Sequence, residues 1–363
     1  MIGCARTHSG GSAISDTRAQ FKRVIRTFRN AADLRAVGLL VLDVALFVGA
    51  FAFTLLAGDP WARLAGGAVM GWVIARLFVI GHDACHQSYV SDRGWNRRIA
   101  WIAFLPSLTT YSLWEAGHNL GHHVYTNLRG RDYVWTPLSK ADYDALPGWR
   151  RALERFYRCG VGYGAYYLVE LWWKKLFFPS AREMASRRSV YTRDSVIVTV
   201  FACTWAAVVV STALYTQQSP LALLGAAMVW PLLVWSALMG CVIYFHHTHP
   251  QLRWYADDAH WEADRDGVST TVNITFPHRI GWLLNNIMAH TAHHLDVRIP
   301  LYHLTPANRA LVAAGAPVLE QRFSWASLAD TVRRCKLYDY DAQRWTDFDG
   351  RYTSPPQREA AAA

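Results

Sequence analysis

Several features of soluble and secreted proteins are missing from this 363-residue sequence. Charged residues make up only 18% of it, whereas a typical soluble domain has roughly 25%. The six cysteines form no CxxC pair, so we expect no disulfides and no iron–sulfur cluster. Residues 1–35 are polar and basic and lack the apolar core of a signal peptide. The sequence also has no dinucleotide-binding fingerprint and no haem-binding HPGG stretch, which excludes two common built-in redox cofactors.

Long apolar runs are what the sequence has in abundance. Hydrophobic residues make up 52% of the chain although its mean hydropathy is only +0.04, so apolar runs alternate with polar stretches. Four runs contain only two charged residues, Asp43 and Arg76. Each is long enough to cross a hydrocarbon core about 30 Å thick. These runs are residues 36–58, 64–81, 195–215 and 221–245.

Short turns containing GDPW and QQSP join the runs into two pairs. We therefore predict an all-α integral membrane protein with four transmembrane helices in two hairpins and a helical cytoplasmic cap. The alternative is a set of buried helices in a large soluble protein. The expected organisation is a cytoplasmic N-terminal segment (1–35), a membrane domain (36–310) and a cytoplasmic C-terminal segment (311–363).

The distribution of basic residues predicts the orientation. The loops near 59–63 and 216–220 hold one basic residue, Arg63, and the opposite ends of the runs carry nearly all the others. The positive-inside bias therefore puts both termini and the polar lobes in the cytoplasm. Two weaker apolar segments are expected not to cross the membrane. The segment 99–113 re-enters or lies flat, and the aromatic segment 160–178 lies in the interface.

Histidine is concentrated in four short clusters, which hold 11 of the 15 histidines. The topology that apolar runs and basic residues alone predict puts all four clusters at one membrane face. Imidazole is the commonest protein ligand for transition metals. The number of rings exceeds what one ion needs, so two metals are the simplest interpretation, with iron the natural candidate for activating O₂. The clusters are His82 and His86; His118, His122 and His123; His246, His247 and His249; and His290, His293 and His294.

The motifs HxxxH, HxxxHH and HxxHH, in this order, resemble those of the membrane-bound fatty acid desaturase superfamily of non-haem diiron enzymes. Residues 127–139, 162–179 and 285–304 extend the likeness, which covers about residues 35–310. The resemblance implies two iron ions with O₂ as co-substrate. It also implies His247 as a ninth, isolated ligand, with His246 and His249 as rivals. The other implied ligands are His82, His86, His118, His122, His123, His290, His293 and His294.

Four acidic residues near the motifs are expected to accept hydrogen bonds from the outer ring nitrogens of the ligands, as carboxylates commonly do at metal sites. They are Asp83, Glu115, Asp132 and Asp296. The first motif departs from the glycine-rich HDxGHGS of many relatives, because Cys85 and Gln87 stand in place of glycines. This departure leaves the reaction open. A double bond in a fatty acyl chain is the expected product, and hydroxylation, acetylenation and decarboxylation to a terminal alkene are the alternatives.

The expected partners are a fatty acid or fatty acyl substrate, membrane lipids and an external electron donor such as ferredoxin with its reductase. The arginine-rich face suits an acidic electron carrier and anionic lipid heads equally well. No nucleic acid is expected, and the resemblance to bacterial enzymes implies a bacterial inner membrane. The competing class is a membrane metal transporter.

The aromatic residues of the segment 160–178 are interpreted as interface anchors. The alternative is that they border a substrate tunnel. These residues are Tyr163, Tyr166, Tyr167, Trp172 and Trp173.

Overall fold

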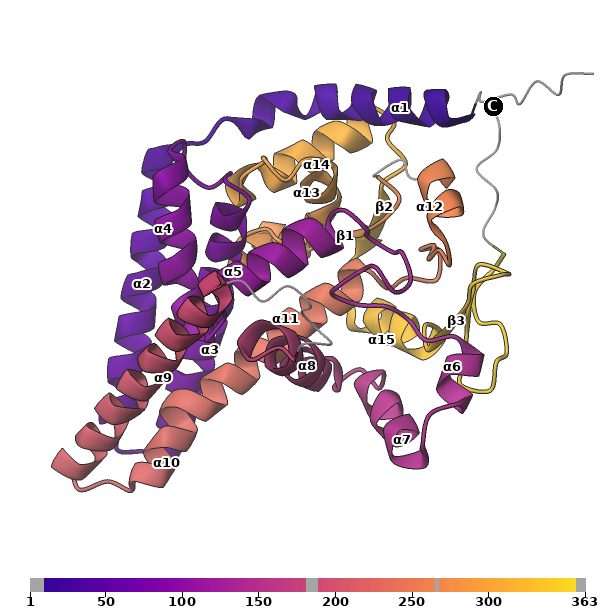
Figure 1. The fold of residues 1–363 in the computed structure, drawn as a ribbon. Coiled ribbons are helices and arrows are strands. Elements are labelled where there is room, and N and C mark those ends of the chain that lie inside the picture. The colour runs from indigo at the N-terminus through magenta and orange to yellow at the C-terminus, as the bar shows by residue number, and fades with distance from the viewer. Residues whose placement is uncertain (1–9, 181–188, 265–267, 357–363) are drawn as a thin grey trace, which may run out of the picture.

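Two long helical hairpins dominate the computed structural model, which describes residues 10–180, 189–264 and 268–356 (Figure 1). The first hairpin pairs α2 (Asp33–Leu56) with α3 (Pro60–Cys85). The second pairs α9 (Ser189–Tyr215) with a helical run, Pro220–His246, made of α10 (Pro220–Leu224), η5 (Gly225–Val229) and α11 (Trp230–His246). All four are long and apolar enough to cross a membrane, which confirms the four predicted spans and their pairing.

Both hairpin turns use the same start signal for the second helix. Asp59 precedes Pro60 and accepts a hydrogen bond from the backbone N–H of Ala62 at 2.7 Å. Ser219 precedes Pro220 and caps α10 in the same way. Proline suits the first helical position because its fixed φ is already helical and no intrahelical donor is lost there. The turn sequences therefore set where the second and fourth spans begin.

Helix α3 is the centre of the membrane part. In its most apolar window 72% of the residues are buried, compared with 17% in α2 and 22% in α9. It packs against α2, α4 (Arg93–Phe104) and α11. The outer helices leave large apolar side chains exposed along their length, as is expected of surfaces that face lipid. The end of α3 is therefore held from several sides.

The two charges inside the spans form a buried ion pair. The Arg76 guanidinium donates to Asp43 at 2.7 Å and to the carbonyl of Trp282 at 2.6 Å. Asn285 completes the network by donating to Asp43 at 3.2 Å. The pair thereby binds α2 and α3 to η6 (Pro277–Leu284), the segment that leads to the last histidine cluster.

The two weaker apolar segments do not form spans among the described residues. Residues 99–113 belong to α4, η2 (Leu105–Ser107) and α5 (Tyr111–Trp114), which lie beside the end of α3. The aromatic segment forms α8 (Tyr163–Tyr166) and the π-helix η4 (Tyr167–Phe177). It packs closely on α11, where a Cβ at Gly240 would lie 2.3 Å from the carbonyl oxygen of Tyr163.

The cap is mostly helical, as predicted, but it also contains two small two-stranded sheets. Strand β1 (Val272–Thr275) pairs in parallel with β2 (Leu319–Arg322), with Val272 opposite Leu319. Strands β3 (Leu337–Asp339) and β4 (Arg344–Thr346) are antiparallel. The remaining elements are α1 (Gly10–Val24), η1 (Arg26–Arg29), η3 (Glu115–His122), α6 (Lys140–Asp144), α7 (Gly148–Tyr157), α12 (Asp258–Asp264), α13 (His290–Leu295), η7 (Leu301–His303), α14 (Leu304–Ala313) and α15 (Trp325–Arg334).

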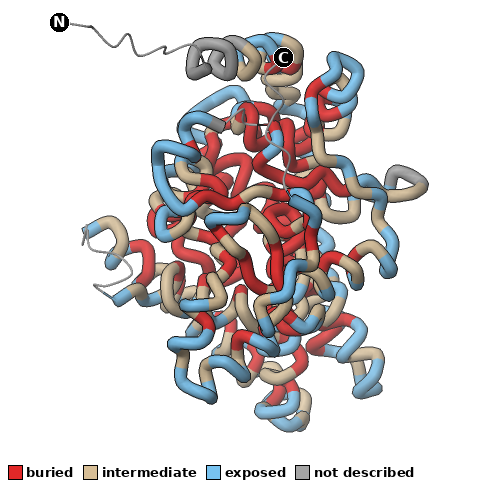
Figure 2. Tube along the Cα trace, turned by 90° about the vertical axis from the view of Figure 1, so that its right-hand side faces the viewer, coloured by how far each residue is buried: buried red, intermediate tan, exposed pale blue. Residues whose placement is uncertain are grey.

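Helix α1 crosses one side of the cap and lies over α14 (Figure 1). Buried residues concentrate in the middle of the molecule, where the ends of the spans meet the cap (Figure 2). The predicted terminal segments extend at both ends beyond the described residues, so Cys4 and residues 357–363 lie outside them.

Candidate metal centre

The first histidine pair lies at the end of α3. His82 is in the last turn and His86 directly follows the helix, so the two rings lie on one side of it and their centroids are 4.7 Å apart. Asp83 accepts a hydrogen bond from Nδ1 of His82 at 3.0 Å and also from the backbone N–H of Leu301. This bond puts the ring proton on Nδ1 and leaves the Nε2 lone pair of His82 directed toward the other clusters.

The second cluster is carried by a π-helix. In η3 the backbone N–H of His123 donates to the carbonyl of His118, five residues earlier, at 3.0 Å. This wider turn puts His118 and His123 on one face, whereas an α-helix would bring His118 together with His122. Gly117 permits the approach of a neighbouring loop, since a Cβ there would lie 2.2 Å from the ring of Tyr133.

His122 points to a different set of residues. Its Nδ1 is 2.8 Å from Oδ1 of Asp132, which also accepts the backbone N–H of Val134 at 3.0 Å. Oδ2 of Asp132 accepts the backbone N–H of Asn127 at 3.0 Å. The Asp132 side chain is therefore fixed, and it holds the outer proton of the His122 ring.

Thr126 is a site residue outside the sequence-based prediction, which included only carboxylates beside the rings. Its hydroxyl donates to the carbonyl of His122 at 2.7 Å and lies 3.3 Å from Nδ1 of His294, whose proton it is placed to accept. Thr126 lies four residues after His122, and this spacing is the sequence signal that could have identified it.

The last cluster lies on the short helix α13, where His290, His293 and His294 are all buried. The start of this helix is held by the side chain of Asn308, whose oxygen accepts the backbone N–H of Ala292 at 3.0 Å.

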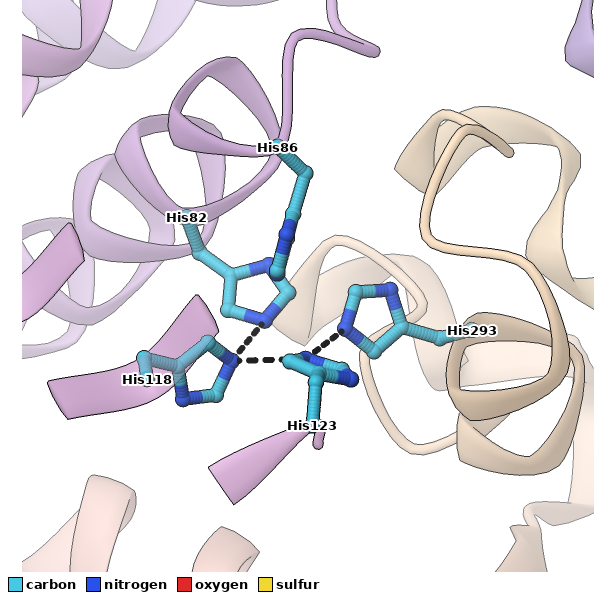
Figure 3. A group of neighbouring side chains, drawn as sticks. All are labelled: His82, His86, His118, His123 and His293. Carbon is cyan, nitrogen blue, oxygen red and sulfur yellow. Dashed lines mark hydrogen bonds between the residues drawn. The ribbon is translucent and has the colours of Figure 1, made fainter. Parts of the chain in front are cut away.

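The nine predicted ligands fall into two groups, within each of which the candidate donor atoms lie within 4.8 Å of one another. Figure 3 shows the first group, in which the Nε2 atoms of His82, His118, His123 and His293 follow one another at 3.1, 3.0 and 3.1 Å. Donors at right angles around an ion about 2.1 Å away would also be about 3 Å apart. The first group is His82, His86, His118, His123 and His293, and the second is His122, His247, His290 and His294.

Many ring nitrogens of this set have no other partner. Six of these nine rings have a buried nitrogen with no hydrogen bond to the described residues, namely His86, His123, His247, His290, His293 and His294. In His123 and His293 that nitrogen is Nδ1, whereas their Nε2 atoms face the other rings of the first group. Burial lowers the pKa of His293 well below its ordinary value, and neighbouring histidines lower it further. The pKa values of His290 and His294 are lowered by the same two causes. Neutral imidazoles whose Nε2 atoms converge at 3.0 to 3.1 Å cannot all donate to one another, and a cation would supply the shared partner.

The structure distinguishes the three histidines that follow α11. His247 joins the second group, with ring centroids 4.6 Å from His122 and 5.1 Å from His294. His246 stacks on His290 at 3.7 Å but belongs to neither group. His249 turns away, and its Nδ1 accepts the backbone N–H of Gln251 at 3.1 Å.

Two of the four expected carboxylates bond elsewhere. Among the described residues, Asp296 pairs with Arg29 and Arg298 and with no histidine. Glu115 accepts a hydrogen bond from the hydroxyl of Tyr111 at 2.9 Å. The expectation that these two side chains orient ligands is therefore not met, because arginine and tyrosine donors lie closer to them. Asp83 and Asp132 remain as the carboxylates beside the rings.

An apolar cavity of about 60 Å³ borders both groups. It has room for about four water-sized groups, which corresponds to a short stretch of a hydrocarbon chain. Tyr167 and Leu171 of η4 line it, so the interpretation of Tyr167 as an interface anchor is wrong, whereas Trp173 on the same helix is 57% exposed. Histidines of both groups lie in its wall, together with Phe78, Val79, Trp114, Leu176, Met239, Val242, Ile243 and Ile287.

Comparison with known proteins agrees with this arrangement. A family model of fatty acid desaturases matches residues 59–324. The sn-1 oleoyl-lipid 12-desaturase of Picosynechococcus sp. is 31% identical over 84% of this chain and 85% of its own length. The chloroplastic omega-6 fatty acid desaturase of Spinacia oleracea is 27% identical over 85% of this chain and 66% of its own length. The sn-1 acyl-lipid omega-3 desaturase (ferredoxin) of Synechocystis sp. is 27% identical over 81% of this chain and 78% of its own.

These relatives are named as desaturases rather than hydroxylases, decarboxylases or metal transporters. The family model covers the histidine motifs, the apolar cavity and most of the cap. The chain therefore belongs to the fatty acid desaturase family of membrane oxidoreductases.

Proposed function

We propose that the nine histidines hold two iron ions, and that the protein uses them to introduce a double bond into a fatty acyl chain. The observation that carries this proposal is the contact between the two histidine groups and one apolar cavity. When bound, a pair of irons supplies the oxidising power that removal of two hydrogens from unactivated methylenes requires, using O₂ and two electrons from outside.

The role of the surrounding residues is to fix the rings. Asp83 and Asp132 hold the Nδ1 protons of His82 and His122, and Thr126 does the same for His294. Each of these bonds selects the tautomer whose other nitrogen is free to bind metal and restricts rotation of the ring. The protein thereby presents preformed donors, so metal binding needs little rearrangement.

The role of the cavity is to position the acyl chain and to exclude water. Its wall between the histidines is built from aliphatic and aromatic side chains of α3, η4 and α11. If a short stretch of an acyl chain occupies this cavity, one defined carbon of the chain lies beside the histidine groups. Position matters here, because a misplacement of about 1 Å costs roughly 100-fold in rate.

We propose that the electrons come from a ferredoxin, in keeping with the name of the Synechocystis relative. Helix η3 is a candidate contact region, because His118 and His123 are only partly buried there and Leu120 between them is 65% exposed. A carrier at this surface lies close to the first histidine group. The basic residues of the cap favour an acidic carrier.

We further propose that the substrate is an acyl chain of a membrane lipid, as in the names of the two cyanobacterial relatives. The proposed location is a bacterial inner membrane, with the termini and the histidine motifs on the cytoplasmic side. The excess of arginine and lysine at that end of the spans supports this orientation.

Two measurements test the proposal. Iron analysis of the full chain, purified after growth with ample iron, is expected to give close to two irons per chain. Lipids from cells that express the protein and are fed a labelled saturated fatty acid should contain a labelled product two mass units lighter, with an internal double bond. Protein without iron after such growth, or cells without a labelled alkene, would contradict the proposal.

A further inference from the structure

A second and larger cavity lies on the outer side of the segment that leads to the last histidine cluster. Its volume is about 470 Å³, within the range of about 300–1,000 Å³ of small-molecule sites. The backbone between Asn286 and His290 separates it from the metal site. Asn286, Met288 and Ala289 face the larger cavity, whereas Ile287 and His290 face the apolar one.

Two guanidinium groups lie in the wall of this cavity. Arg35, in the first turn of α2, lies over the ring of Tyr302 at 5.3 Å, and Arg309 extends from α14. Both are exposed, and neither has a carboxylate partner among the described residues. Arginines that have no acidic partner are suited to bind a phosphate, because the planar guanidinium offers two parallel donors to two oxygens.

One acidic residue, Glu320 on β2, also lies in the wall. An oxygen of its carboxylate accepts a hydrogen bond from Asn273 at 2.9 Å, and Glu320 forms no ion pair with the described residues. The cavity therefore offers two positive groups and one negative group. This combination matches a ligand that carries a phosphate and an ammonium group better than it matches a purely anionic ligand.

The surroundings of the cavity favour a ligand that belongs to the membrane. Arg35 lies where a spanning helix begins, and its neighbour Leu34 is 90% exposed. Trp282, in the cavity wall, is 56% exposed, and Ile280, two residues earlier, is 39% exposed. Exposed tryptophan and aliphatic residues beside arginine at the end of a span are typical of the lipid headgroup region.

We propose that this cavity binds the headgroup of a zwitterionic membrane phospholipid, with its phosphate on Arg35 and Arg309 and its ammonium group at Glu320. The site goes beyond the desaturation reaction, because it recognises a headgroup on the far side of the segment that carries His290. A lipid bound there contacts the outer side of a backbone whose inner side borders the metal groups.

Native mass spectrometry of the full chain in detergent tests the proposal. Dioleoyl phosphatidylethanolamine is titrated against diacylglycerol with the same chains, and the affinity of the first bound lipid is compared. We expect the phospholipid to bind at least about tenfold more tightly, since a charge-assisted bond contributes about that factor. The R35Q/R309Q variant should lose about tenfold or more, and R35K/R309K should retain most of the affinity.

Arg97, an exposed arginine on α4, provides the matched control, and R97Q should bind as the wild type does. E320Q should weaken the binding of phosphatidylethanolamine. It should leave the affinity for phosphatidylglycerol unchanged, because that lipid has no ammonium group. The proposal would be overturned if the wild-type protein bound dioleoyl phosphatidylethanolamine and diacylglycerol with equal affinity. It would also be overturned if R35Q/R309Q bound the phospholipid as tightly as the wild type does. Soluble phosphoethanolamine binding as tightly as the lipid would also overturn it, by pointing to a free phosphate ester. The readout needs no turnover, so failure of the desaturase assay is a separate result.

Discussion

His118 and His123 lie five residues apart, and the backbone N–H of His123 donates to the carbonyl of His118 at 3.0 Å while their Nε2 atoms are also 3.0 Å apart. This relationship depends on the π-helix, because its backbone hydrogen bonds join residues that are five positions apart. It assigns the two outer histidines of the HxxxHH motif to one histidine group and leaves His122 for the other. One short segment thus contributes histidines to both groups.

Replacing His293 with alanine should abolish turnover and reduce the iron content. The Nε2 of His293 is 3.1 Å from that of His123, and the residue is fully buried in the first group. Product analysis and iron analysis of the purified variant check this result. His249→Ala is the control, since its ring bonds Gln251 outside both groups and should leave both quantities unchanged. Normal product formation by His293→Ala would remove this residue from the ligand set.

Replacing Asp132 with asparagine should weaken metal binding by about 10- to 100-fold, the usual cost of losing a partner that orients a ligand. The asparagine cannot hold the proton of His122 as the carboxylate does. Competition with a chelator measures the affinity. Asp296→Asn is the matched control, because Asp296 pairs with Arg29 and Arg298. Equal losses in the two variants would show that Asp132 acts only on stability.

Replacing Leu171 with phenylalanine should lower turnover of a long acyl chain at least about tenfold, because the larger ring fills the cavity beside the metal groups. The iron content should stay the same. Trp173→Phe, a substitution on the exposed side of the same helix, should leave turnover unchanged. Gas chromatography of the labelled products compares the two, and equal activity of both variants would mean that substrate does not use this cavity.

Replacing Asp43 with asparagine should destabilise the protein by about 3–5 kcal/mol, because Arg76 would stay buried without its partner. Unfolding in detergent, followed by circular dichroism, measures the change. The double substitution Asp43→Leu/Arg76→Met should recover part of the loss, since no charge stays buried. Full recovery is not expected, because Arg76 also donates to the carbonyl of Trp282. An Asp43→Asn variant that is as stable as the wild type would contradict the prediction.

Iron-free protein should lose stability as the pH falls below about 6.5. Burial lowers the pKa values of His118, His123, His290 and His293 well below those of the unfolded chain. Below pH 6.5 the unfolded chain therefore binds protons that the folded protein does not, and unfolding becomes more favourable. Denaturant unfolding at pH 7.5 and 5.5 measures the difference. Identical stability at both values would show that the rings are solvated.

The spans and the clustered histidines were predictable because they depend on local pattern. A run of 18 or more residues with at most one charge specifies a membrane helix by its length and composition alone. The Asp59–Pro60 and Ser219–Pro220 turns then specify where the second helix of each hairpin begins. The spacing of the histidines identified all nine residues that the structure brings together.

Partner choice was not predictable, because it depends on residues far apart in the sequence. Asp83 directly follows His82, and Asp296 lies two residues after His294. Only Asp83 bonds a histidine, because Arg29 approaches Asp296 from η1, 267 residues earlier in the chain. Tyr167 and Trp173 belong to one aromatic run, and only the packing of η4 on α11 decides which lines the cavity. The sequence by itself determined the spans and the histidines that cluster, whereas the tertiary structure decided how these histidines divide into two groups and which side chains hold them.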